Sequence, residues 1–162
     1  GRISNFLSGG ITQTVFHRTA ASINNTGIGT LISDWDSGTN ERSFYLIKRG
    51  DLANDPYEII RAPNGTSTGA NGTSYFPQIS TDVCHVLDFK STFSYYLNKV
   101  EVATNSTTTS LFNSSSDITV SALLNSNSAG FFGEQTVKAS AFCNATLTAT
   151  QRETITDLIN AL

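Results

Sequence analysis

Short runs of β-branched and aromatic residues recur along this chain, each bounded by clusters of Gly, Asn, Asp and Ser. Such runs favour strands, because branched side chains pack well on a pleated surface. The bounding clusters favour turns, because Gly and Asn tolerate positive φ. Nine segments fit the strand pattern: 15–23, 30–35, 43–49, 57–61, 83–89, 93–97, 100–103, 118–124 and 136–142. They predict an all-β fold, an antiparallel β-sandwich, jelly roll or barrel, with turns that include residues 36–40, 63–72, 105–110 and 125–130.

A helical pattern occurs once, at the end of the sequence. Thr148 and Gln151 have the spacing of a capping box, in which each side chain satisfies a backbone N–H at the start of a helix. Four apolar residues then follow at i, i+3, i+4 and i+7, namely Ile155, Leu158, Ile159 and Leu162. The pattern predicts one C-terminal α-helix that packs on the sandwich through this stripe.

The domain organisation follows from length and composition. A chain of 162 residues is expected to form one domain, and no internal repeat divides it. Residues 1–13 are expected to be a lead-in or linker because Gly9-Gly10 interrupts them. The jelly-roll domain is then predicted over residues 14–162.

Uncharged groups supply most of the polarity of the chain. Charged residues make up 14%, against roughly 25% in an average soluble domain. Ser and Thr together number 42 and Asn numbers 14, so a third of the chain is one of these residues. A net charge of −3 gives no basic surface for nucleic acid or for an anionic membrane. No apolar run approaches the roughly 20 residues that span a bilayer.

Three blocks of sequence carry a resemblance to a known superfamily. They read GTLISDWD (29–36) with RSFYL (42–46), CHVLDF (84–89) with YYLNKVEVA (95–103), and FFG (131–133) with VKASAF (137–142) and NATLTATQRE (144–153). In this order they resemble the concanavalin A-like lectin/glucanase superfamily in its laminin-G-like form. Lys99 departs from the pattern, because many relatives have Gly in that hairpin turn, where positive φ is required.

The resemblance implies a jelly-roll sandwich whose relatives include both lectins and glucanases. The low-charge composition is also similar to that of domains in phage fibres, spikes and other virion appendages. By analogy with such fibres we expect a homotrimer on a virion surface, in contact with other virion subunits, or an extracellular location.

Residues for glycoside hydrolysis are not grouped in this sequence. Retaining glycosidases need two carboxyl groups about 5 to 5.5 Å apart, yet the five glutamates are isolated and no Glu-x-Asp-x-x-Glu pattern occurs. His17 and His85 are the only histidines, and no Gly-x-Ser-x-Gly occurs. Cys84 and Cys143 are expected to be free thiols, although spacing alone leaves a bridge open. We therefore predict a protein that is not an enzyme.

Calcium is the alternative ligand that the loops suggest. Some relatives hold it through loop carboxylates and carbonyl oxygens. Acidic and amide residues cluster in two neighbouring loops, the first with Asp34, Asp36 and Asn40 and the second with Asp51, Asn54 and Asp55. Neither has the spacing of a dedicated calcium loop, and these residues also occur in turns for their own backbone hydrogen bonds. We predict no metal site and no cofactor, and keep calcium as the alternative.

A sugar site needs an aromatic surface for the C–H face of the ring and a few polar groups for its hydroxyls. Trp35, the single tryptophan, lies between two aspartates at a strand end beside a polar loop. Trp35 could equally fill the core, as large aromatic residues often do. The candidate carbohydrate-binding residues are Trp35, Asp36, Asn40, Tyr57 and Tyr75. They place a recognition rim at the loop near Trp35 and at the loop over residues 64–76.

The sequence thus predicts a non-enzymatic carbohydrate-recognition domain of a phage fibre or spike, which binds glycan on the host surface. One alternative is a structural virion protein, such as a capsid decoration or fibre building block, without a ligand of its own. Another is a carbohydrate-binding or adhesin module of a larger secreted protein. Exposed aromatic side chains in the loops would favour recognition, and aromatic side chains buried at protein contacts would favour a structural role.

Overall fold

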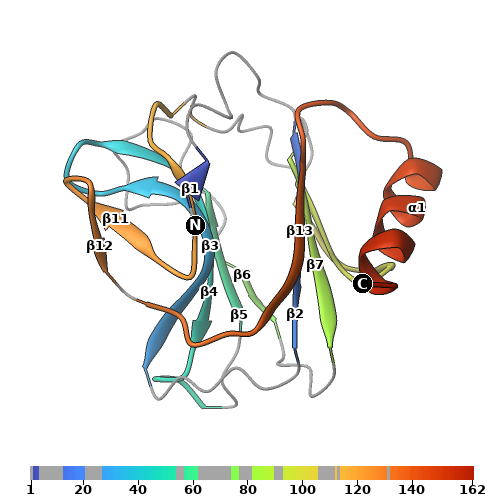
Figure 1. Ribbon diagram of the computed structural model, residues 1–162, viewed down its shortest axis with the longest axis horizontal. Helices are drawn as coiled ribbons and strands as arrows, with labels where there is room; N and C mark the ends of the chain where they lie inside the picture. Colours follow the sequence, from blue (N-terminus) through green and yellow to red (C-terminus); the bar gives the residue numbers. More distant parts are fainter. Residues whose placement is uncertain are drawn as a thin grey trace. The chain divides into compact units, whose positions relative to one another are not determined.

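The computed structural model describes residues 2–3, 13–20, 27–53, 57–61, 74–76, 82–89, 93–105, 112, 114–130 and 132–162. The chain divides into two compact units, each built around one β-sheet (Figure 1). Unit 1 comprises residues 1–9, 24–78 and 111–135, and unit 2 comprises residues 10–23, 79–110 and 136–162. Both units therefore combine segments that are far apart in the sequence.

The sheet of unit 1 has the strand order β1-β10-β3-β4-β5-β6, with β11 and β12 attached beside β3. Its strands are β1 (Arg2–Ile3), β3 (Ile28–Asp36), β4 (Glu41–Arg49), β5 (Tyr57–Arg61), β6 (Ser74–Phe76), β10 (Ile118–Val120), β11 (Leu123–Asn125) and β12 (Ser128–Gly130). Its pairings are antiparallel, except that β11 meets β3 in parallel where Leu124 lies opposite Asp36. This contact brings the β11–β12 hairpin to the end of β3.

The sheet of unit 2 has the order β13-β2-β7-β8-β9 and is antiparallel throughout its described pairings. Its strands are β2 (Gln13–Thr19), β7 (Val83–Phe89), β8 (Phe93–Leu97), β9 (Val100–Asn105) and β13 (Val137–Cys143). Helix α1 (Ala149–Asn160) packs on this sheet, and Figure 1 shows it in red beside the strands. Ile159 joins Phe16, Cys84, Val86 and Tyr96 in one buried apolar cluster.

Most of the strands were predictable from the residue pattern. Each of the nine expected segments contains a strand, and residues 57–61, 83–89 and 93–97 match in full. The segment 118–124 was wrong as one strand, because Ser121 adopts a φ of 65° and separates β10 from β11. The expected turn at residues 125–130 is a hairpin whose turn is only Ser126-Asn127, both with positive φ, as a type I′ turn requires. Residues 21–23 of the first expected strand lie outside the described residues.

The predicted lead-in contains one described strand. Arg2–Ile3 form β1, which pairs with Ile118 and Thr119 of β10, and Gln13 begins β2. Residues 4–12 lie outside the described part of the chain.

Lys99 occupies the β8–β9 turn without the strain that its place in the sequence suggested. Only Asn98, the first central residue, has a positive φ, of 55°. The Lys99 ammonium pairs with the Asp157 carboxylate of α1. The turn thus tolerates a side chain at position 99 and uses it to contact the helix.

Neither cysteine forms a bridge. Cys84 is buried in the cluster beneath α1, and Cys143 is half-buried. Burial raises the pKa of Cys84 to about 12, which keeps the thiol protonated at neutral pH.

The helix begins as its sequence predicts. The Thr148 hydroxyl accepts from the Gln151 backbone N–H at 3.2 Å, and Gln151 Oε1 accepts from the Thr148 backbone N–H at 2.9 Å. This closes the capping box. Within the described residues, no helix is long enough and apolar enough to span a membrane.

The predicted apolar stripe is confirmed for Ile155 and Ile159, which pack on the buried cluster, and wrong for the other two residues. Leu158 is 65% exposed and Leu162 is 80% exposed, whereas Thr156 and Ile159 are buried. Thr156 is buried without an unsatisfied hydroxyl because its Oγ1 donates to the Arg152 carbonyl. Arg152 also faces the sheet, where its guanidinium lies 4.0 Å from the centre of the Tyr96 ring. The helix is therefore rotated so that Thr156 and Arg152 share the buried face with Ile155 and Ile159.

Replacement of the two neighbouring apolar residues tests this orientation. Ile159→Ala is expected to lower the free energy of unfolding by about 2–4 kcal/mol, because it leaves a cavity in the buried cluster. Leu158→Ala removes an exposed side chain and is expected to change stability by less than about 0.5 kcal/mol. Urea denaturation of both variants measures the difference, and equal losses would contradict the orientation.

Candidate functional site

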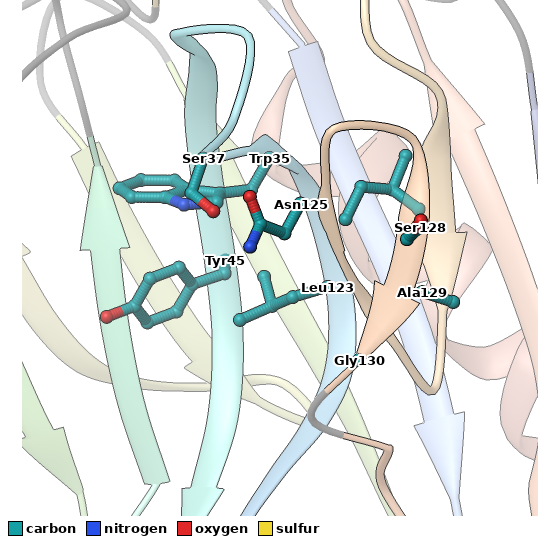
Figure 2. A pocket seen from close by; sticks show the side chains of 9 residues that line it. Trp35, Ser37, Tyr45, Leu123, Asn125, Ser128, Ala129 and Gly130 are labelled. Carbon is teal, nitrogen blue, oxygen red and sulfur yellow. The ribbon is translucent and has the colours of Figure 1, made fainter.

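A hollow of about 400 Å³ lies in unit 1, beside the end of β3 and the β11–β12 hairpin (Figure 2). This volume falls within the range of small-molecule sites. Nine residues line it: Trp35, Ser37, Tyr45, Leu123, Leu124, Asn125, Ser128, Ala129 and Gly130.

Two aromatic side chains form one wall of the hollow. Trp35 and Tyr45 meet edge to face, with ring centres 4.8 Å apart and planes at 66°. The Arg42 guanidinium lies 5.8 Å from the centre of the Trp35 ring and donates to the Ser37 carbonyl at 2.8 Å. Trp35 is only 6% exposed. The indole is therefore held firmly by its neighbours and offers a small part of its surface to the hollow.

The β11–β12 hairpin and the turn after β3 supply the polar groups. Asn125 and Ser128 are exposed and Ser37 is half-buried. Figure 2 shows the Asn125 carboxamide directed toward the side of the hollow where Trp35 and Tyr45 lie. A primary amide offers two donors and one acceptor oxygen, so this side chain can bond to two adjacent hydroxyls of a ligand.

The Asp36 carboxylate holds the hairpin in place. Oδ1 accepts from the backbone N–H groups of Gly38 at 2.9 Å and Ser126 at 2.7 Å, and Oδ2 accepts from that of Asn127 at 2.8 Å. Asp36 is 1% exposed. Burial alone would raise the pKa of Asp36, but the N–H groups of Asn127, Gly38, Ser126 and Thr39 outweigh it and lower the pKa. The group is thus an ionised anchor between β3 and the hairpin.

Gly38 permits this close approach. A Cβ at position 38 would lie 2.0 Å from Ser126 Oγ and 2.4 Å from the Ser126 backbone nitrogen. Any other residue would push the hairpin turn away from β3. The turn over residues 37–40 therefore needs glycine for space, while Asn40 closes it with a φ of 60°.

Replacement of the anchor tests its role. Asp36→Asn is expected to lower the free energy of unfolding at pH 7 by roughly 1.5–3 kcal/mol, because hydrogen bonds to a charged acceptor are lost. The folded-state pKa lies below the ordinary 3.8, so this contribution is complete above pH 3.8 and is lost as pH falls through the lower value. Denaturation of wild type and variant at a series of pH values below 7 is expected to show that the difference in their free energies of unfolding becomes smaller in acid.

Asp157→Asn is the matched control for this experiment. Asp157 forms an exposed ion pair with Lys99, and its loss is expected to cost less than about 1 kcal/mol. An Asp36→Asn variant as stable as this control at pH 7 would show that Asp36 is not an anchor.

Asp34, two residues earlier, is in the opposite situation. It is 1% exposed, and neither carboxylate oxygen has a hydrogen-bond partner among the described residues. Burial raises the pKa of Asp34 to about 7, the nearby Ser114 hydroxyl opposes part of this rise, and Glu41 and Asp117 add to it. Asp34 is thus largely protonated below neutral pH.

The raised pKa predicts a loss of stability as the pH rises from about 4 to 7. A carboxyl group whose folded pKa is raised stabilises the fold fully below its unfolded pKa of 3.8, and this contribution is lost as pH rises through about 7. The free energy of unfolding of Asp34→Asn is therefore expected to rise relative to that of wild type between pH 4 and pH 7, by on the order of a few kcal/mol. Denaturation at pH 5 and pH 8 measures this gain, and a gap independent of pH would contradict it.

The two loops considered for calcium use their acidic groups differently. Asp36 accepts from backbone N–H groups, and Asp51 pairs with Arg49 through two contacts of 2.7 Å. Asn54 and Asp55 lie outside the described residues. Within the part of the chain that the structure describes, no group of three or more His, Cys, Asp or Glu is arranged to hold a metal ion.

The predicted sugar-binding residues whose side chains are described lie in different surroundings. Trp35 lines the hollow, Asp36 anchors the hairpin and Asn40 is an exposed residue of the neighbouring turn. Tyr57 lies in β5 with 1% exposure, so its ring is part of the core of unit 1. Tyr75 lies in β6 opposite Glu58, and its side chain falls outside the described residues, as do residues 62–73 of the expected rim.

Sequence reasoning missed Tyr45 and the whole hairpin wall. Tyr45 is one residue of a strand, and nothing in the sequence pairs it with Trp35. The sequence predicts only a turn over residues 125–130. A turn pair at Ser126-Asn127 with Leu123 and Leu124 before it was the available signal for a hairpin.

No family model and no curated protein matches this chain. Solved structures do match it. The CBM40 domain of the Ruminococcus gnavus IT-sialidase bound to α2,3 sialyllactose gives a TM-score of 0.69 at 10% identity, over 93% of this chain and 84% of that one. A SAP-like pentraxin from Limulus polyphemus gives 0.64 at 14% identity, over 91% and 70%.

The leech intramolecular trans-sialidase gives a TM-score of 0.68 at 13% identity over 91% of this chain, which spans about a quarter, 24%, of that enzyme. At these identities the likeness shows the fold. The predicted fold class, a jelly-roll β-sandwich with a C-terminal helix, is confirmed.

Proposed function

We propose that this chain is a non-catalytic carbohydrate-binding domain, and that the hollow beside Trp35 is its sugar site. The observation that carries the proposal is the pairing of two walls across one hollow. Trp35 and Tyr45 supply aromatic surface, and Asn125, Ser37 and Ser128 supply uncharged hydrogen-bonding groups. Binding sites of this kind combine apolar surface with a few placed polar groups, which suits a pyranose ring with its C–H face and hydroxyls.

The composition of the lining supports binding without catalysis. Hydrolysis of a glycosidic bond uses two carboxyl groups on either side of it. None of the nine described residues that line the hollow is Asp, Glu, His or Cys. The nearby carboxylate of Asp36 is engaged by three backbone N–H groups.

The structural neighbours add support of a different kind. Two of the R. gnavus CBM40 structures are bound to sialyllactose, one to the α2,3 form and one to the α2,6 form. This chain covers 84% and 85% of those domains, so the likeness extends over a whole module. A sandwich of this kind can therefore serve as an independent sugar-binding unit.

The setting of the domain is a further part of the proposal. The low charge and the abundance of Ser, Thr, Asn and Gly support a virion appendage, such as a phage fibre or spike, that contacts glycan on a host surface. In that setting the domain would lie on the virion surface as a trimer with other virion subunits. A module of a larger extracellular protein is the alternative within the same function.

The proposal is tested by removing one polar group from the hollow. A glycan array first identifies a bound glycan, and titration calorimetry then compares wild type with Asn125→Ala. Asn125 is exposed, so the fold is expected to keep its stability within about 0.5 kcal/mol. Loss of the amide hydrogen bonds is expected to weaken binding roughly tenfold.

Asn144→Ala is the matched control, because Asn144 is also exposed but belongs to unit 2. It is expected to bind as wild type does. Unchanged glycan affinity in Asn125→Ala would show that the sugar does not bind in the hollow. A folded chain that binds no glycan would instead favour a structural virion protein.

A further inference from the structure

The walls of the hollow carry no formal charge. All nine described lining residues are neutral at any pH near 7, from the aromatic pair to the small residues Ala129 and Gly130. A ligand that enters therefore meets ring faces, hydroxyls and one carboxamide. This bears on the kind of sugar that the site would accept, and the inference rests on the proposed function.

The cationic side chain of Arg42 contacts the aromatic wall of the hollow. Arg42 donates to the Ser37 carbonyl at 2.8 Å and lies against the Trp35 ring. A carboxylate in the hollow would compete with these two contacts for the guanidinium. Arg42 therefore acts as a support behind the wall.

Three backbone donors in the turns beside the hollow are also taken. Successive N–H groups in a turn can form a concave site for an anion. Here the N–H groups of Gly38, Ser126 and Asn127 all donate to the Asp36 carboxylate. The protein thus fills its own anion site and places a fixed negative charge at this end of the hollow.

We propose that the hollow selects uncharged sugars and disfavours acidic ones, including sialic acids and uronic acids. Among the described lining residues a bound carboxylate would find no cationic side chain to replace the water that it loses, and such burial is costly. It would also lie near the ionised Asp36, and like charges in proximity exclude a ligand. The preference is opposite to the acidic sialyllactose held by the R. gnavus CBM40 structures.

Matched pairs of glycans test the selectivity. Each probe pair joins a neutral sugar to an acidic one: the methyl glycosides of galactose and galacturonic acid, the methyl glycosides of glucose and glucuronic acid, and lactose with 3′-sialyllactose. Each acid is also tested as its neutral carboxyl methyl ester. Saturation-transfer NMR and calorimetry measure binding. For any pair whose neutral member binds, the acid is expected to bind at least tenfold more weakly, the ester is expected to recover most of the loss, and added salt is expected to reduce the gap.

Two outcomes are clearly separable. An acid that binds more tightly than both its neutral partner and its ester would overturn the selectivity and leave the proposed function standing. Absence of binding to every probe and to the glycan array, with the chain folded, would overturn the proposed function and this inference with it.

A pair of glycine substitutions ties the result to the hollow. A Cβ at Gly130 or at Gly27 meets nothing within 4 Å, but only Gly130 lines the hollow. Gly130→Val is expected to weaken the binding of the neutral sugar at least tenfold with no loss of stability, and Gly27→Val is expected to bind as wild type does. Unchanged binding by Gly130→Val would place the sugar elsewhere and overturn the inference.

Discussion

The rest of the candidate site depends on one buried carboxylate. Asp36 joins the end of β3 to the turn that follows it and to a hairpin about ninety residues later in the chain. Its three N–H partners lie at 2.7–2.9 Å, the distances of strong hydrogen bonds to a charged acceptor. Because the hairpin supplies the polar wall, this contact, together with the pairing of β11 with β3, fixes the shape of the hollow.

Asp34 and Asp36 show how two residues of one type and one strand acquire opposite properties. Asp36 is buried with backbone donors around it, so its pKa is lowered. Asp34 is buried as deeply, without a described hydrogen-bond partner and near Glu41 and Asp117, so its pKa rises to about 7. Burial alone fixes neither outcome, because hydrogen bonds to the charged form decide which direction prevails. The sequence Asp-Trp-Asp gives no sign of this division.

Local chemistry explains what could be predicted from the sequence. The strands over residues 57–61, 83–89 and 93–97 follow from branched and aromatic residues bounded by turn formers, and the Thr148–Gln151 cap follows from spacing alone. Prediction from the local residue pattern fails where segments distant in the sequence meet. The parallel contact between Leu124 and Asp36, the meeting of Trp35 with Tyr45 and the rotation of α1 toward Arg152 all depend on tertiary packing. The site is built largely from such contacts, and of the predicted residues whose side chains are described only Trp35 lines the hollow.

The central claim is that sugar binds in the hollow beside Trp35, and the sequence provides a direct probe of it. Trp35 is the single tryptophan, so all indole emission from the chain comes from one wall of the site. Titration of a glycan that the chain binds is expected to change the intensity or wavelength of that emission, with the same midpoint as calorimetric binding. Saturable binding by calorimetry with no change in Trp35 emission would show that the sugar lies elsewhere.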